Sequence, residues 1–145
     1  MPAQRKAEVV WEGDLLKGNG VVKLNSGGLP EFPVTWASRV EQPGGKTSPE
    51  ELLAAAQASC FAMALSATLA RNRTPPQRLH ITAVCTLDKV GDANKVTSMQ
   101  ISVAGNVPGI DQQQFDELAK KAENGCPISN AIRGNVEITL SARLE

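Results

Sequence analysis

The chain has 145 residues and a formal net charge of zero, with 15 basic and 15 acidic side chains. This length is enough for one domain with its own hydrophobic core. The even charge balance offers no basic surface for nucleic acid, so we expect no nucleic-acid partner. The N-terminal sequence contains no apolar signal region and the three cysteines are unevenly spaced, which predicts a cytoplasmic protein without a structural disulfide framework.

The N-terminal part predicts three short strands, over residues 8–12, 19–24 and 34–40. Apolar and β-branched side chains are frequent in these segments. Glycine and proline signals separate them, for example in the sequence Ser26-Gly27-Gly28-Leu29-Pro30.

A long uncharged helix follows. Ser48 is its predicted N-cap, Pro49 occupies the first helical position and Glu51 stands three residues after the cap, which is the pattern of a capping box. The helix should end near residue 72, before two prolines. The 19 residues from 52 to 70 lack charge and could span a bilayer by length, but eight are alanine, which barely favours lipid. We therefore expect a buried central helix and no membrane partner.

The next segments predict a pair of strands over residues 79–89 and 95–107, joined by a turn at Gly91. Apolar and polar side chains alternate along the first of these strands. Cys85 belongs to its apolar face, so we interpret Cys85 as a structural cysteine.

Two helices and a last strand complete the chain. Asp111 caps a predicted helix over residues 112–123, and Gly125 is suited to the position after its end. A short helix then runs from Cys126 and Pro127 to Ile132, and residues 136–144 form a strand.

This order of elements predicts an α+β fold with antiparallel strands, in a single domain over residues 1–145 without internal repeats or a dividing linker. The alanine-rich helix needs apolar contacts on more than one side. Two three-stranded sheets from one chain cover only part of it, so we predict a homodimer.

Two cysteines occupy different local settings. Cys126 begins a predicted helix, where the positive end of the helix dipole stabilises a thiolate, lowers its pKa and exposes it for attack. Cys60 lies inside the alanine-rich helix. A thiol in the middle of a buried helix is inert unless a cation stabilises its thiolate, so the function of Cys60 depends on whether such a cation is present.

Two motifs resemble those of the OsmC/Ohr family, the osmotically inducible and organic-hydroperoxide-resistance proteins. The sequence from Gly45 to Phe61 resembles the peroxidatic motif, and Gly125-Cys126-Pro127-Ile128-Ser129 resembles the resolving-cysteine motif. Matches such as Trp11-Glu12-Gly13-Asp14 and Val107-Pro108-Gly109-Ile110-Asp111 extend the resemblance over the chain, and the context of Arg39 favours the OsmC branch. Gln57 is a departure, because many members have histidine there. We expect this difference to affect local polarity and not the thiol chemistry.

The resemblance implies an OsmC-like fold, with antiparallel sheets around long central helices in an intertwined homodimer. It also implies a thiol peroxidase that protects against oxidative and osmotic stress. A Cys60 thiolate would reduce an organic hydroperoxide to an alcohol, and hydrogen peroxide more slowly, and the resulting sulfenic acid would form a disulfide with Cys126. No metal or organic cofactor is required. The implied reductant is a dithiol such as a lipoylated protein.

The resemblance assigns Arg39 as the cation beside Cys60 and Glu50 as its partner carboxylate. The planar guanidinium can hold a carboxylate while it faces a thiolate. The residues alone also allow Arg39 to be a surface arginine at a strand end, and Glu50 to be a first-turn acid favoured by the helix dipole.

One straight helix keeps Glu50 and Cys60 apart. Ten residues separate them, which is ~15 Å along the axis and ~80° around it. We therefore predict two equivalent sites at a dimer interface, each joining Cys60 and Cys126 of one chain to Glu50 of the other, with the chain that supplies Arg39 left open.

Two other classes of function remain open. A cysteine hydrolase needs a general base beside its nucleophile, and the single histidine, His80, lies outside any motif. A non-catalytic dimer that binds an apolar small ligand is the stronger alternative, because Leu53, Phe61 and Met63 surround Cys60 in the sequence.

Overall fold

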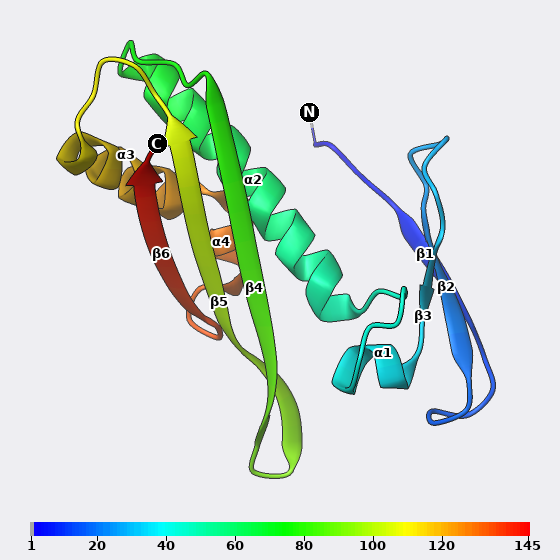
Figure 1. The fold of residues 1–145 in the computed structure, drawn as a ribbon. Coiled ribbons are helices and arrows are strands. Elements are labelled where there is room, and N and C mark those ends of the chain that lie inside the picture. The colour runs from blue at the N-terminus through cyan, green and yellow to red at the C-terminus, as the bar shows by residue number, and fades with distance from the viewer. Residues whose placement is uncertain (1) are drawn as a thin grey trace. The chain divides into compact units, whose positions relative to one another are not determined.

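The computed structural model describes residues 2–145 and has an α+β fold, as the sequence predicts (Figure 1). The chain forms two compact units, one up to Leu52 and the other over Leu53–Glu145. Each unit contains one three-stranded sheet.

In the first unit, β1 (Ala7–Glu12), β2 (Asn19–Leu24) and β3 (Phe32–Val34) form an antiparallel meander. The first two predicted strands are confirmed. Both Val9 and Val10 of β1 are more than half exposed, at 56% and 65%. Adjacent side chains of a strand point to opposite faces of the sheet. Neither face of β1 is therefore covered by the other strands of the first unit.

The prediction of a strand over residues 34–40 is wrong, because β3 ends at Val34 and a short helix follows. Helix α1 (Trp36–Val40) begins after Thr35, whose side chain accepts a hydrogen bond from the Ser38 backbone. The Ser38 hydroxyl in turn accepts one from the Thr35 backbone. This reciprocal cap satisfies backbone N–H groups that would otherwise lack a partner. Its stabilisation of the helix outweighs the preference of the β-branched residues at the start of the segment for a strand.

Helix α2 (Pro49–Arg71) has the predicted start and length. Ser48 accepts a hydrogen bond from the Glu51 backbone at 3.1 Å, which confirms the N-cap. The Glu51 carboxylate bonds to the hydroxyl of Thr47 instead of completing the capping box. By length and composition α2 could cross a membrane, a test that the core helix of a globular protein also meets.

In the second unit, β4 (Arg78–Val90) and β5 (Ala93–Asn106) form a long antiparallel hairpin, as predicted. The last strand, β6 (Glu137–Leu144), pairs with β5 in parallel, which corrects the prediction of antiparallel strands throughout. The cause is the connection between them, because two helices carry the chain back to the end at which β5 began. Such a crossover joins parallel neighbours, whereas a tight turn joins antiparallel ones.

Those helices are α3 (Gln112–Gly125) and α4 (Pro127–Ile132). Figure 1 shows α2 and α3 beside the β4–β6 sheet. Their apolar side chains form one core with the middle strand, composed of Phe61, Leu65, Leu69, Met99, Ile101, Val103, Val107, Phe115, Ala119, Ala122 and Cys126. Cys85 packs against this core from β4, which confirms its place on the apolar face of that strand. The core fixes the middle of α2 against the α3–α4 junction.

Candidate active site

The thiols of Cys60 and Cys126 lie close enough for each to shift the pKa of the other, although 66 positions separate them in the sequence. Cys60 comes from the middle of α2 and is half-buried, and Cys126 comes from the junction between α3 and α4. Cys126 has no exposed surface, which corrects the prediction that its helix-start position exposes it. The core that packs around the junction buries the sulfur and leaves Cys60 as the thiol nearer to solvent.

The backbone at Cys126 changes direction sharply between the two helices. Cys126 is the C-cap of α3 and the N-cap of α4, in an extended conformation with φ −72° and ψ 119°. Gly125 is the last residue of α3 and does not have a positive φ, contrary to the prediction that it follows the helix end. Pro127 explains this difference, because a proline disfavours the helical conformation in the residue before it.

The two thiols have opposite pKa shifts. Burial raises the pKa of Cys60 above its ordinary value, the backbone N–H of Ile128 lowers it, and the hydrogen bond and charge of Cys126 raise it further. Burial alone also raises the pKa of Cys126, but hydrogen bonds from Ser129, Cys60 and Ile128 together outweigh burial and lower it. Within one chain, these hydrogen bonds favour the thiolate form of Cys126 more than that of Cys60.

Gln57 is a site residue whose position the sequence interpretation did not foresee. It is fully buried, and its side-chain nitrogen lies 3.6 Å from the Cys126 sulfur and 2.9 Å from the Ser129 hydroxyl. We expected Gln57 to affect local polarity and not the thiol chemistry, and its nitrogen lies directly against the sulfur of Cys126. Its place one turn before Cys60 on α2 was a usable signal, because residues three apart share a helix face.

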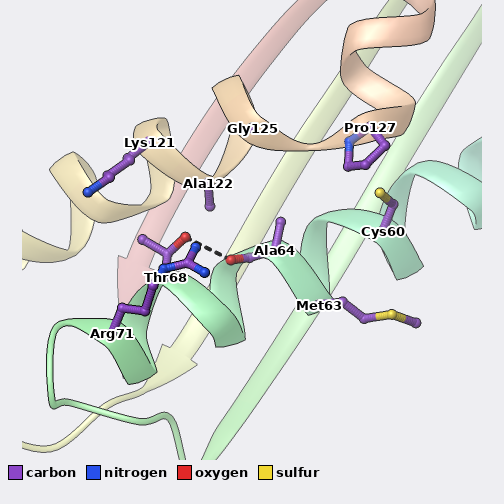
Figure 2. A pocket seen from close by; sticks show the side chains of 9 residues that line it. All are labelled: Cys60, Met63, Ala64, Thr68, Arg71, Lys121, Ala122, Gly125 and Pro127. Carbon is purple, nitrogen blue, oxygen red and sulfur yellow. Dashed lines mark hydrogen bonds between the residues drawn. The ribbon is translucent and has the colours of Figure 1, made fainter. Parts of the chain in front are cut away.

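A pocket of ≈ 510 Å³ opens beside Cys60, between α2 and the α3–α4 junction. Figure 2 shows Cys60 and Pro127 near one end of this pocket and Arg71 and Lys121 near the other. The residues that line it are Cys60, Met63, Ala64, Thr68, Arg71, Lys121, Ala122, Gly125 and Pro127. The wall next to the thiol is therefore mainly apolar, and the opposite end bears two cations.

Arg39 and Glu50 are paired in the first unit. Two hydrogen bonds join the guanidinium to the carboxylate, at 3.0 and 2.9 Å, and the Glu50 side chain is 9% exposed. The guanidinium carbon also lies 5.9 Å from the centre of the Trp36 ring, within the range of a cation–π contact. Arg39 comes from α1 and not from a strand end, and one-third of its side chain remains exposed beside the ion pair.

His80 is exposed on β4. Among residues 2–145, histidine, cysteine and acidic side chains form no group of three or more with the spacing of a metal site.

Comparison with known sequences identifies similar proteins along the whole chain. The family profile described as OsmC-like protein matches residues 42–141. The chain is 39% identical to peroxiredoxin OsmC of Escherichia coli over 145 residues, which is 100% of this chain and 99% of that protein. It is 35% identical to an organic hydroperoxide resistance protein of Xanthomonas axonopodis pv. citri over 100 residues, which is 68% of each chain.

Solved structures give the same result for the fold. An organic hydroperoxide resistance protein from Elizabethkingia anophelis, with thiocyanate bound, superposes with a TM-score of 0.74. The two chains are 27% identical, and the match covers 100% of each.

Proposed function

Because the chain belongs to the OsmC-like family, we propose that it is a cysteine-based peroxidase that reduces organic hydroperoxides to alcohols. The observation that supports this function best is the contact between Cys60 and Cys126 beside an apolar pocket. A similar E. coli protein is named a peroxiredoxin, and other relatives are named for resistance to organic hydroperoxides.

In the first step, the Cys60 thiolate attacks the terminal oxygen of the hydroperoxide. The O–O bond breaks, the alkoxide leaves and takes up a proton to become an alcohol, and Cys60 becomes a sulfenic acid. The apolar wall formed by Met63, Ala64 and Ala122 favours substrates with an alkyl group over hydrogen peroxide.

In the second step, the Cys126 thiolate attacks the Cys60 sulfur. An S–S bond forms, the S–O bond breaks, and hydroxide leaves and takes up a proton from solvent. The disulfide protects Cys60 from further oxidation. An external dithiol, such as a lipoylated protein, then reduces the disulfide by thiol–disulfide exchange.

The first step requires the negative charge on Cys60, whereas the contacts within one chain favour Cys126 as the anion. A cation beside Cys60 reverses this order, because it stabilises the Cys60 thiolate. We assign this role to Arg39, oriented by its two hydrogen bonds to Glu50.

A homodimer is part of the proposal. Val9 and Val10 leave both faces of β1 exposed within the first unit, and Met63 of α2 is 72% exposed. A second copy of the chain would remove this apolar surface from water. Such a partner would also supply Glu50 to the Cys60 of the first chain, because ten residues of continuous helix hold the two residues of one chain ~15 Å apart.

The test is the thiol-dependent consumption of cumene hydroperoxide and tert-butyl hydroperoxide compared with hydrogen peroxide. We expect both organic substrates to react faster, and Cys60→Ser to abolish turnover with the fold retained. Cys85→Ser is the matched control and should keep activity. Turnover by Cys60→Ser, or a preference for hydrogen peroxide, would contradict the proposal. Lack of turnover by the wild type would favour a dimer that only binds apolar ligands.

A further inference from the structure

Gln57 is buried in direct contact with the second thiol. Its exposure is 0%, and its side-chain nitrogen donates to the Cys126 sulfur at 3.6 Å and to the Ser129 hydroxyl at 2.9 Å. A glutamine amide has two N–H groups, so each has one acceptor here. The contact therefore presents a hydrogen-bond donor to the sulfur of Cys126.

The other groups around this sulfur are donors as well. The Ser129 backbone, the Cys60 thiol, the Ser129 hydroxyl and the Ile128 backbone all interact with Cys126 in the sense that favours its thiolate. The Ser129 oxygen accepts from Gln57, which leaves its own proton to point at the sulfur. Gln57 thus acts on Cys126 both directly and through Ser129.

The oxygen of the Gln57 amide, unlike its nitrogen, lacks a hydrogen-bond partner. This oxygen is buried, and none of the described residues donates a hydrogen bond to it. A buried carbonyl without a partner destabilises the folded state, and an apolar side chain of similar size would avoid this loss. Stability alone therefore does not explain a glutamine at this position, whereas the contact of its nitrogen with a thiol does.

We propose that Gln57 is a positioning residue for disulfide formation, which holds the Cys126 sulfur as a hydrogen-bond acceptor against Cys60. This inference rests on the proposed peroxidase function. Cys126 attacks the Cys60 sulfenic acid, the S–S bond forms as the S–O bond breaks, and the hydroxide that leaves is protonated by solvent. Because the sulfur is already held as an acceptor, the disulfide forms before a second hydroperoxide oxidises Cys60 to a sulfinic acid.

A neutral amide suits this role over a wide pH range, because it does not titrate as a histidine would. Among the described residues, Cys60 is the ionisable group that shifts the pKa of Cys126. Glu123, three residues earlier in the chain, is held in an ion pair with Arg133 at 3.1 Å. The pH dependence of disulfide formation should therefore follow the two thiols.

The test compares Gln57→Met with wild type, and uses Ser59→Ala as a matched control. The Ser59 hydroxyl is on the same helix and bonds to the carbonyls of Ala55 and Ala56. In a Cys60→Ser background, Gln57→Met should shift alkylation of Cys126 to higher pH. In the chain with both thiols, the fraction of Cys60 converted to sulfinic acid per equivalent of cumene hydroperoxide should rise several-fold. Ser59→Ala should change neither quantity.

The alkylation measurement needs no peroxide, so it separates failure of this inference from failure of the proposed function. An unchanged alkylation profile in folded Gln57→Met would overturn the positioning role. An unchanged sulfinic acid fraction, in a wild type that does reduce hydroperoxides, would also overturn it. If Gln57→Met does not fold, Gln57→Leu provides the second variant, because it also removes the amide nitrogen that contacts Cys126. The same shift is expected there, and no shift would reject the proposal.

Discussion

Arg39 and Glu50 form a two-pronged ion pair, with Nε 3.0 Å from Oε1 and Nη2 2.9 Å from Oε2. This geometry uses the planar fork of the guanidinium, which lysine lacks. Glu50 is nearly buried, whereas about one-third of the Arg39 side chain remains exposed. The exposed part is available to a further anion, and the proposed anion is the Cys60 thiolate.

Arg39→Lys keeps the charge but loses the second hydrogen bond. We expect the apparent pKa for Cys60 alkylation to rise and hydroperoxide turnover to fall roughly tenfold or more, since one misplaced charge-stabilising group costs about 10² to 10³ in rate. Stopped-flow turnover and a pH series of alkylation measure the two effects. Arg78→Lys is the control, because Arg78 also pairs with a carboxylate, that of Glu145, on the surface. An unchanged alkylation profile would leave Arg39 as a surface residue.

Mixed dimers test whether the site is shared between chains. A chain with Cys60→Ser and a chain with Glu50→Ala should each be inactive, and their heterodimer should regain one intact site. The control pairs Cys60→Ser with Cys126→Ala, which leaves no intact pair of thiols in either chain and should not recover. Absence of recovery in purified Cys60→Ser and Glu50→Ala heterodimers would show that Glu50 acts in its own chain.

Cys126→Ala should lower the apparent pKa of Cys60. Burial is the largest cause of the raised pKa of Cys60 and remains in the variant, but the hydrogen bond and charge of Cys126 also raise it and are lost. The Cys60 thiolate should therefore form at lower pH than in wild type. Alkylation of Cys60 across a pH series measures this shift, with Cys85→Ser as the control. A rise in the apparent pKa would mean that Cys126 stabilises the Cys60 thiolate.

One equivalent of hydroperoxide should produce a disulfide between Cys60 and Cys126 of the same chain. Their thiols are close enough to shift each other's pKa, whereas Cys85 packs against the core from β4. Mass spectrometry of peptides from non-reduced protein identifies the bridge, and non-reducing electrophoresis separates bridges within a chain from those between chains. A dominant bridge to Cys85, or a covalent dimer, would contradict this assignment.

Val10→Lys should weaken the proposed dimer. The side chain is 65% exposed in one chain, and a charge placed there would be costly if a partner covers this face. Sedimentation velocity should show a shift toward monomer, together with a lower melting temperature. Val90→Lys is the control at the end of the β4–β5 hairpin, where the valine is 48% exposed. Identical behaviour of the two variants would argue against a partner on β1.

Several elements follow from the sequence because their signals are local. The cap of α2 depends on a hydrogen bond between residues three apart, from the Glu51 backbone to Ser48. The alternation of apolar and polar side chains along β4 indicates which face of the strand is buried. The helix over residues 36–40 was missed although its signal is also local. Its cap joins Thr35 to Ser38, but the β-branched residues before it favour a strand.

The motifs around Cys60 and Cys126 predicted a pair of cooperating thiols, but their surroundings depend on packing. The position of Gln57 one turn before Cys60 is local, but its contact with Cys126 joins residues 69 positions apart and depends on the fold. The parallel pairing of β6 with β5 depends on where two intervening helices return the chain. The sequence by itself determined most of the elements and both motifs, because these arise from short-range hydrogen bonds and periodic burial. Only the tertiary structure decided that Cys126 is buried among hydrogen-bond donors, because the core brings α2 against the α3–α4 junction.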